Sequence, residues 1–118
     1  MANLPSTVLK RIDKRQRLWS EVGRGWFPLL EEMDRKLAAL FPDYTVSQVK
    51  EKLGFLRVYV DNVDERAYKI LDEYECKSTH ICEVCGEIGQ TVNVHNWLKT
   101  LCRKHEAERR EKLKNTGL

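Results

Sequence analysis

The sequence lacks any long apolar run and any apolar segment near its N-terminus. No stretch approaches the roughly 18 apolar residues that a membrane-spanning helix requires. Residues 1–17 contain no apolar core of the kind found in a secretory signal. We therefore expect a cytoplasmic protein with no membrane partner. Because cytosolic thiols stay reduced, the four cysteines of the chain indicate metal binding rather than disulfide bonds.

Internal repeats and low-complexity tracts are also absent, which excludes a repeat architecture. With 118 residues, of which 42% are hydrophobic and 33% are charged, the chain is too short for a multidomain assembly. It fits one small domain with an attached sub-domain. A chain of this length buries about two-thirds of the surface that its unfolded form exposes. We therefore expect a thin hydrophobic core that needs an additional cross-link.

A strong excess of charge of one sign is missing as well, since the net charge is only +3. The distribution is uneven: residues 1–27 are net basic, residues 28–76 are net acidic and residues 77–118 are net basic. The basic ends suit a partner that carries phosphates or acidic groups, and the acidic middle suits a basic protein surface. This balance is weaker than the basic signature of a dedicated nucleic-acid-binding domain.

The first 79 residues predict an α+β domain of two helices, a β-hairpin and a third helix. The first helix is expected from Ser6 or Thr7 to Val22, with Val8, Ile12, Trp19 and Val22 on its apolar face. Its opposite face would carry a basic stripe of Lys10, Lys14 and Arg17. Pro28 suits the first turn of a second helix, which is expected to run to Phe41.

A change of period after this helix predicts strands. Residues 44–60 are rich in β-branched and aromatic residues around Leu53-Gly54, which is typical of a β-hairpin. In that hairpin Lys50 would lie opposite Arg57, with Lys52 on the same face. A third helix is expected from residue 63 to about residue 75. Cys76 is placed in this helix, and we expect its thiol to be buried rather than to serve as an alternative metal ligand.

Residues 80–118 predict a zinc-binding unit. Cys82 and Cys85 form a C-x2-C pair, and Cys102 and His105 form a C-x2-H pair after sixteen intervening residues. Each pair can chelate from one tight turn, and two such pairs supply the four N or S ligands of a tetrahedral zinc ion. The intervening segment suits a short hairpin, and the second pair begins a helix. A helix N-terminus favours the thiolate form of a cysteine there, which is the form that binds metal.

This order of turn, hairpin and helix predicts a treble-clef-like zinc finger with one structural Zn²⁺. Since four protein ligands complete the coordination shell, no position is left for a water or a substrate, and we expect no enzymatic activity. His80 and His95 are assigned ordinary surface roles. Trp97 is placed where it would cover the zinc site.

The chain resembles a group of small phage and bacterial proteins. The resemblance is carried by these blocks: Gly25-Trp26-Phe27-Pro28-Leu29, Pro42-Asp43-Tyr44, Gln48-Val49-Lys50-Glu51-Lys52 with Gly54 and Leu56-Arg57, Cys82-Glu83-Val84-Cys85-Gly86, and Trp97-Leu98-Lys99-Thr100-Leu101-Cys102 with His105. This sequence has Gly54-Phe55 where such proteins tend to have a Gly-Gly pair, and His95-Asn96 where they tend to have glycines. The resemblance implies zinc binding and a phage or prophage setting, hence the host-cell cytoplasm, but no activity.

Three functional hypotheses follow. The first is a phage accessory factor that binds and modulates or inhibits a host protein or defence complex, with Trp19, Trp26 and Trp97 serving either as core residues or as interface anchors. The second is a nucleic-acid-binding protein that uses three basic patches. The patches consist of Lys10, Lys14 and Arg17; Lys50, Lys52 and Arg57; and Arg103, Arg110 and Lys114. No array of aromatic residues for stacking on single strands is evident in the sequence.

The third hypothesis is a nuclease of the His-Asn-His type. Such a site needs a general-base histidine at the end of a strand and a second metal-binding residue on the next helix, beside a catalytic cation. Only His95-Asn96 offers the first of these, and His105 is assigned to the zinc ion. The nuclease is therefore the weakest of the three hypotheses.

Overall fold

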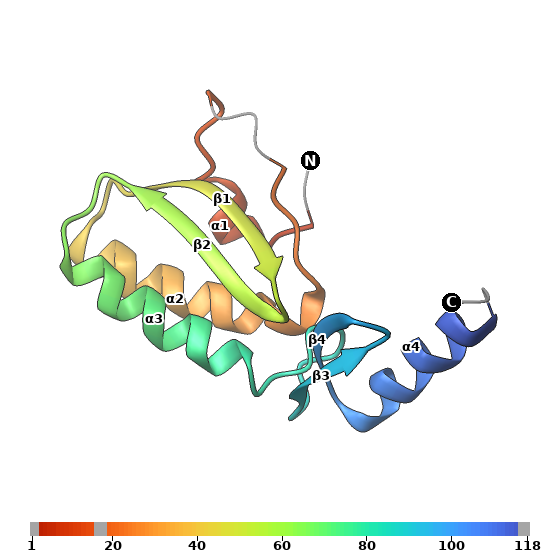
Figure 1. The fold of residues 1–118 in the computed structure, drawn as a ribbon. Coiled ribbons are helices and arrows are strands. Elements are labelled where there is room, and N and C mark those ends of the chain that lie inside the picture. Colours follow the sequence, from red (N-terminus) through yellow and green to blue (C-terminus); the bar gives the residue numbers. More distant parts are fainter. Residues whose placement is uncertain (1–2, 16–18, 116–118) are drawn as a thin grey trace.

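A computed structural model describes residues 3–15 and 19–115 (Figure 1). It has the predicted α+β fold, with helices packed on a β-hairpin, followed by a second hairpin and a C-terminal helix. The elements in order are α1 (Ser6–Leu9), the 3₁₀ helix η1 (Arg24–Trp26), α2 (Phe27–Leu40), β1 (Thr45–Lys52), β2 (Phe55–Asp61), α3 (Arg66–Ser78), β3 (Gln90–Val94), β4 (Trp97–Leu101) and α4 (Arg103–Asn115). Within the described residues, no helix is both long enough and apolar enough to cross a membrane.

The first hairpin turns at Leu53 and Gly54, as predicted. Both residues have positive φ, 53° and 89°, which gives the tight two-residue turn that matches the twist of the flanking strands. Lys50 pairs with Arg57 across the two strands, in the predicted register. The side chains then alternate, so that one face of the hairpin carries buried residues and the other carries polar ones.

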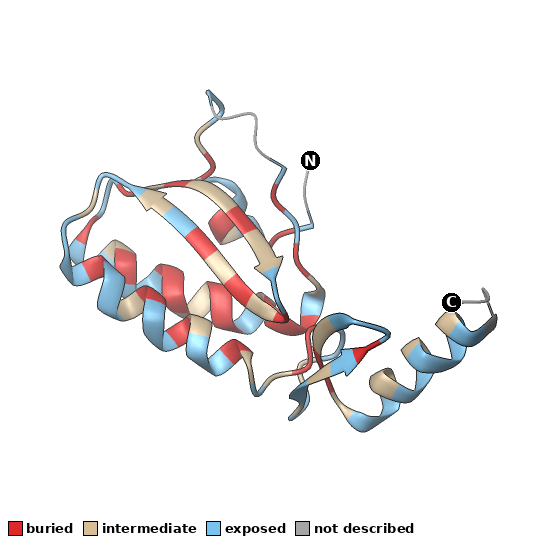
Figure 2. Ribbon diagram, in the orientation of Figure 1, coloured by how far each residue is buried: buried red, intermediate tan, exposed pale blue. Residues whose placement is uncertain are grey.

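Helices cover only one face of this hairpin. Figure 1 shows α2 and α3 beneath β1 and β2, with α1 behind them and the opposite face open. The covered face forms the core, which Figure 2 shows as the zone of buried residues between hairpin and helices. The fully buried large side chains of this core are Val8, Trp26, Leu30, Met33, Leu37, Tyr44, Val46, Val49, Leu56 and Tyr74. At its rim Asp34 accepts hydrogen bonds from the Tyr44 hydroxyl and from Nε of Arg11.

The predicted first helix is wrong beyond its first turn. After α1, the backbone N–H of Asp13 donates to Val46 O, and Val46 N–H donates to Arg11 O. Further along, Glu21 N–H donates to Val49 O. The segment therefore runs along the free edge of β1, where exposed strand N–H and C=O groups need partners. These edge hydrogen bonds replace the helical ones, because one backbone group cannot satisfy both.

This correction moves two residues of the predicted basic stripe. Lys10 is exposed just after α1, and Lys14 is exposed in a turn, so the two do not share a helix face. Arg17 lies outside the described residues. Trp19, expected on an apolar helix face, is 62% exposed.

The third helix begins and ends three residues later than predicted. Asn62 has a φ of 68°, and the Asp64 carboxylate accepts the backbone N–H of Arg66, so the chain turns before the helix starts. At the other end Ser78 Oγ accepts the N–H of Leu56, and Glu75 accepts the N–H of Val58. α3 thus covers the free edge of β2. Cys76 points away from this contact and is exposed, which corrects the expected buried thiol.

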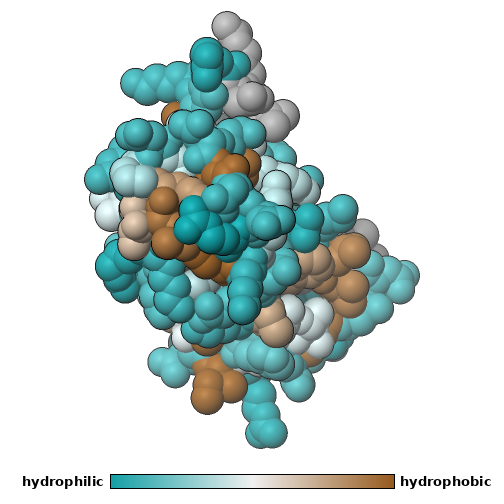
Figure 3. All heavy atoms as spheres, turned by 90° about the vertical axis from the view of Figure 1, so that its left-hand side faces the viewer, coloured by the Kyte–Doolittle hydropathy of each residue, from teal (hydrophilic) through white to brown (hydrophobic). Residues whose placement is uncertain are grey.

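The outer surface is mainly hydrophilic. The end of the molecule seen in Figure 3 shows hydrophilic side chains with several separate hydrophobic areas and no single broad one. Scattered apolar side chains are ordinary on a protein surface, whereas a large continuous patch marks an interface. That end of the molecule therefore offers no extended apolar docking surface.

Candidate metal centre

Four side chains from two separate turns meet at the start of α4. Cys82, Cys85, Cys102 and His105 bring one ligand atom each to within 4.8 Å of one another. Among the described residues this is the only group of three or more Cys, His, Asp or Glu side chains placed to hold a metal ion. The four predicted ligands are therefore brought together.

The first pair lies on a tight turn. Gly86 N–H donates to Cys82 O over 2.9 Å, and Cys82 N–H donates to Glu87 O over 2.7 Å. Gly86 has a φ of 85°, a conformation that glycine adopts without steric cost. This turn directs the Cys82 and Cys85 side chains to the same point.

The second pair is presented by the end of β4 and the first turn of α4. Cys102 directly precedes the helix, and its carbonyl accepts the N–H of Glu106. His105 lies in the first turn, so its ring reaches back toward Cys102. β3 and β4 join the two pairs through a hairpin whose central turn residues, His95 and Asn96, both have positive φ.

The separations between ligand atoms fit one tetrahedral ion. Cys85 Sγ lies 3.8 Å from Cys102 Sγ, and Cys82 Sγ lies 3.6 Å from Nδ1 of His105. Ligands at about 2.3 Å for sulfur and about 2.0 Å for nitrogen lie about 3.8 and 3.5 Å apart at the corners of a tetrahedron. Cys102 Sγ is 3.2 Å from Nδ1 of His105. All four cysteines of the chain are free thiols.

The thiols influence one another's ionisation. Burial raises the pKa of Cys82, but backbone N–H groups of Cys102, Cys85 and Val84 more than offset this and lower it overall. The Glu87 N–H lowers the pKa of Cys85, yet burial and the neighbouring Cys82 and Cys102 sulfurs outweigh it and raise it. Several thiolates at such short distances repel each other. A divalent cation would remove that repulsion, so the donor set fits Zn²⁺.

The outer ring nitrogen of His105 faces a carboxylate. Nε2 lies 3.8 Å from Oε2 of Glu108, one helical turn further along α4. Metal-bound histidines commonly direct the second ring nitrogen toward a carboxylate, which fixes the ring orientation. Glu108 is placed for this role, with Nδ1 left to face the sulfurs.

The turn at residues 81–87, which we call the metal turn, is attached to the N-terminal domain by hydrogen bonds to its backbone that the sequence did not suggest. Gly25 N–H donates to Glu83 O over 2.7 Å, and Trp26 Nε1 donates to Ile81 O over 2.8 Å. A Cβ on Gly25 would lie 2.0 Å from Cys82 O. Only glycine allows η1 to approach the turn this closely. In the sequence, the close spacing of Gly23, Gly25 and Trp26 is the feature that could have indicated this contact.

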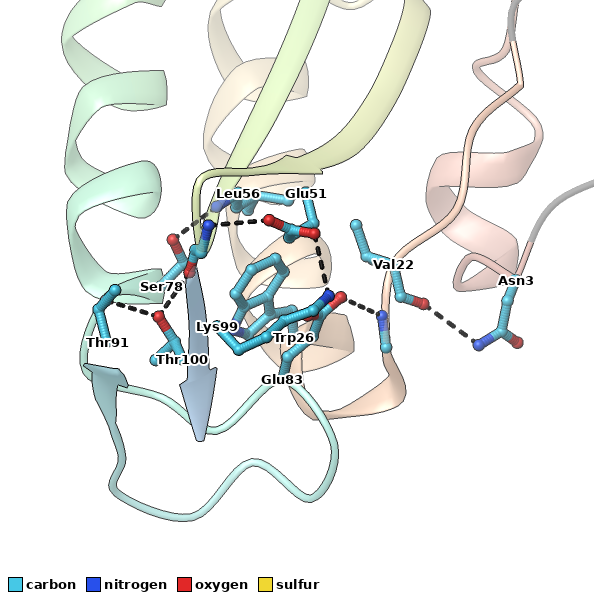
Figure 4. A network of polar contacts seen from close by, with 12 residues as sticks. Asn3, Val22, Trp26, Glu51, Leu56, Ser78, Glu83, Thr91, Lys99 and Thr100 are labelled. Carbon is cyan, nitrogen blue, oxygen red and sulfur yellow. Dashed lines mark hydrogen bonds and ion pairs between the residues drawn. The ribbon is translucent and has the colours of Figure 1, made fainter. Parts of the chain in front are cut away.

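A partly buried ionic contact joins the same two regions (Figure 4). Lys99 on β4 lies 3.0 Å from a carboxylate oxygen of Glu51 on β1 and 3.6 Å from one of Glu83 in the metal turn. Glu83 also accepts the N–H of Gly23. Thr100 donates to Gly54 O at the tip of the first hairpin. The second hairpin is therefore held against the tip of the first.

The other predicted site residues lie apart from the metal centre. Lys50, Lys52 and Arg57 lie on the first hairpin, and Arg103, Arg110 and Lys114 are exposed on α4. Arg110 is bound to the Glu106 carboxylate over 2.9 Å and to Asn93 O over 3.1 Å. The α4 patch is thus partly neutralised.

The structure places Trp26 in the core and Trp97 on the surface. Trp26 is fully buried and belongs to the core. Trp97 lies at the turn end of β4, the opposite end of this strand from Cys102, and is 57% exposed. It packs against Arg109, whose guanidinium carbon is 5.3 Å from the ring centre. Trp97 therefore contacts α4 rather than covering the metal site, because a five-residue strand separates the two.

Comparison of the chain with protein-family models, with curated proteins and with solved structures finds no match.

Proposed function

We propose that this protein is a non-enzymatic zinc protein that acts by binding another macromolecule. One Zn²⁺, held by Cys82, Cys85, Cys102 and His105, folds its C-terminal unit. The observation that carries the proposal is the convergence of these four ligand atoms within 4.8 Å of one another. Four protein ligands complete a tetrahedral shell, which is typical of structural zinc rather than catalytic zinc.

The arrangement around the metal centre supports a structural role. The two ligand pairs come from elements on either side of the β3–β4 hairpin, so a bound ion would cross-link the start and end of the unit. Such a cross-link offsets the conformational entropy of a short segment with little core of its own. The hydrogen bond of Gly25 and the ion pair of Lys99 then attach the ordered unit to the N-terminal domain.

The nuclease hypothesis receives no support from the geometry. His95 and Asn96 fill the tight turn between β3 and β4, and the histidine of α4 that a nuclease would need belongs to the Cys₃His group. A hydrolytic site would require a second cation with open coordination positions.

The resemblance to small phage proteins supports a finer hypothesis about the partner. We expect an accessory factor that binds and modulates or inhibits a host protein or defence complex. Purified protein should then retain one stoichiometric host protein from a nuclease-treated lysate. Loss of every retained component on nuclease treatment would contradict a host-protein partner and favour nucleic acid.

Elemental analysis tests the metal centre directly. We expect one zinc per chain in the purified wild type, and loss of zinc in Cys85→Ser and Cys102→Ser. Cys76→Ser is the matched control, because Cys76 is exposed and lies outside the cluster, and it should retain the full zinc content. The proposal would be overturned by a wild-type protein that contains no zinc when purified without chelators and takes up none after addition of Zn²⁺.

A further inference from the structure

The open face of the first hairpin carries a set of basic and aromatic side chains. Near the turn, every second residue of β1 and β2 lies on the same side of the hairpin. These residues are Lys50, Lys52, Phe55, Arg57 and Tyr59. They therefore project from the face opposite α2 and α3. We call these five residues the hairpin face. Figure 1 shows no helix over this side of the hairpin.

Two of the three cations of the hairpin face lack a compensating carboxylate. Among the described residues, Lys50 and Lys52 have no carboxylate partner, and Arg57 reaches one, Glu75, over 3.3 Å. Lys50 also pairs directly with Arg57 across the strands. Like charges placed opposite each other destabilise a hairpin unless an anion lies between them. The arrangement therefore favours a ligand with negative charges.

Aromatic rings lie among these cations. Lys50 Nζ is 5.6 Å from the ring centre of Tyr59, and the Arg57 guanidinium carbon is 5.5 Å from the same centre. Arg57 is also 5.9 Å from the Phe55 ring centre. The hydrogen bond from Arg57, followed by the charges of Lys50 and Lys52, lowers the pKa of the Tyr59 phenol. The hairpin face thus has a positive potential at an exposed aromatic ring.

A cleft extends the hairpin face toward Trp19. The cleft has a volume of about 540 Å³ and is lined by Trp19 and Lys50 among others. Gln48, which pairs with Tyr59 across the hairpin, donates its side-chain N–H to Trp19 O. This bond fixes the backbone of Trp19 next to β1, and the indole is largely exposed. Three carboxylates line the cleft: Glu51 and Glu83 already pair with Lys99, and Glu21 is exposed.

The other basic patches predicted from the sequence are weaker candidates. The N-terminal patch does not form a helical stripe, and on α4 Arg110 is bound to Glu106 and Asn93. Glu108 and Glu111 dilute α4 further. Trp97 and Arg109 also bring an exposed ring and a cation together beside α4, but only the hairpin face, among the described residues of the three predicted patches, has its own cations packed around the Tyr59 ring.

From this juxtaposition we infer that the hairpin face and the adjoining Trp19 cleft bind a single-stranded nucleic acid. Lys50, Lys52 and Arg57 contact phosphates, while Tyr59 and Trp19 stack on bases. A single strand fits better than a duplex, because its unpaired bases are free to stack on aromatic rings. The inference rests on the proposed binding role, and for this surface it takes a single-stranded nucleic acid, rather than the host protein of the phage hypothesis, as the partner.

Fluorescence anisotropy with a labelled twelve-nucleotide oligo(dT), and with oligo(U) and a mixed-sequence duplex of equal length, tests this inference. We expect both single strands to bind more tightly than the duplex. Two to three phosphate contacts on a single strand predict that affinity falls roughly ten-fold between 50 and 200 mM salt. Duplex binding as tight as single-strand binding, or an affinity independent of salt, would overturn the inference.

Matched variants locate the site. The double variant Lys50→Glu, Lys52→Glu should weaken oligo(dT) binding at least ten-fold, whereas Arg103→Glu, Lys114→Glu makes the same charge change on α4 and should leave binding within two-fold. Loss of binding in the α4 variant alone would overturn the assignment. Zinc content and unfolding midpoint, measured for each variant, confirm that it is folded.

Substitutions of the aromatic residues test stacking independently of charge. Tyr59→Leu should weaken binding about 5- to 150-fold, and Tyr59→Phe, which keeps the ring, should restore most of it. Trp19→Leu should also weaken binding, and Trp19 is exposed enough that folding does not depend on it. If Tyr59→Leu binds like wild type, the stacking site is wrong. A zinc-loaded, folded wild type that binds no oligonucleotide overturns this inference alone, whereas a zinc-free wild type overturns the proposed function.

Discussion

The N-terminal domain and the metal-binding unit are stabilised by different means. The hydrophobic core cluster draws all its buried members from residues 4–74. After residue 79, the buried hydrophobic residues of the described chain are Cys82, Val94 and Leu101, and one of these is a metal ligand. Figure 2 shows α4 without buried residues. The comparison teaches that the first region folds by burying apolar surface, and the second requires a cross-link.

The balance of free energies favours a metal cross-link in the second region. A buried aliphatic side chain contributes about 1.5–3 kcal/mol, so two buried aliphatic residues cannot offset the ordering of some 35 residues at about 1–2 kcal/mol each. Structural zinc contributes about 10–16 kcal/mol in isolated finger peptides. Under the proposed function, a bound zinc ion and the contacts with the N-terminal domain would together make this region stable.

Removal of zinc should have the largest effect and should separate the two regions. With a chelator, we expect amide hydrogen exchange to become fast throughout residues 80–115, because the thiolates then repel each other without a cation. Residues 27–74 should keep their protection, since their core contains no ligand. Hydrogen exchange measured by mass spectrometry checks this. Loss of protection in both regions together would show that they fold as one unit.

A core substitution should have the next largest effect and act on the other region. Leu37 is fully buried in α2, and Leu37→Ala should lower the free energy of unfolding by about 2–5 kcal/mol. Urea unfolding followed by tryptophan fluorescence measures the change. The native protein should still carry one zinc ion per chain. A fall in zinc content under native conditions would contradict independent stabilisation.

The junction between the regions should be sensitive to a single methyl group. In Gly25→Ala the new Cβ would lie 2.0 Å from Cys82 O and 2.6 Å from Gly86 N, so η1 and the metal turn must separate. We expect a loss of about 1–3 kcal/mol or more. Zinc dissociation, followed with a chromogenic chelator, should also become faster. Ala107→Ser, an exposed change on α4, is the control and should leave both quantities unaltered.

Two glutamates of α3 should give the smallest effects, with opposite signs. Burial raises the pKa of Glu75 despite the opposing Val58 N–H, so its contribution is present at low pH and falls as pH rises from the usual 4.5 through the folded-state pKa. Lys77 and then Lys36 lower the pKa of Glu73, so its contribution is present at higher pH and falls as pH drops below 4.5.

Urea unfolding at several pH values measures both effects against wild type. Glu75→Gln keeps an oxygen to accept the Val58 N–H and should flatten the decline above pH 4.5. Glu73→Gln should flatten the loss of stability below pH 4.5. Changes of the same sign in the two variants would contradict the assigned causes.

Local patterns predicted much of the fold. Leu53-Gly54 and the β-branched residues around it indicated the first hairpin and its register, because both depend on neighbouring residues. Pro28 placed the second helix near its observed start at Phe27. The paired spacing of Cys82, Cys85, Cys102 and His105 predicted the cluster, because each pair needs only one turn to bring its ligands together.

Other features depended on contacts between distant residues. The apolar period of residues 6–22 predicted a helix, but hydrogen bonding to the edge of β1 decided otherwise. Cys76 was expected to be buried and Trp19 to lie on an apolar helix face, and both are exposed. The sequence did not indicate that Trp19 and Tyr59 lie near the same strand, because they are forty positions apart and are linked only through Gln48 of β1, which bonds to Trp19 O and pairs with Tyr59.

The sequence by itself determined the ligand set, the two hairpins and the α+β class, since each follows from spacing or period within a short segment. The tertiary structure alone decided how the metal turn docks on Gly25, how Lys99 joins it to Glu51, and which side of the first hairpin stays open. Those features depend on long-range packing and on the demand of strand edges for hydrogen-bond partners, which no local pattern records.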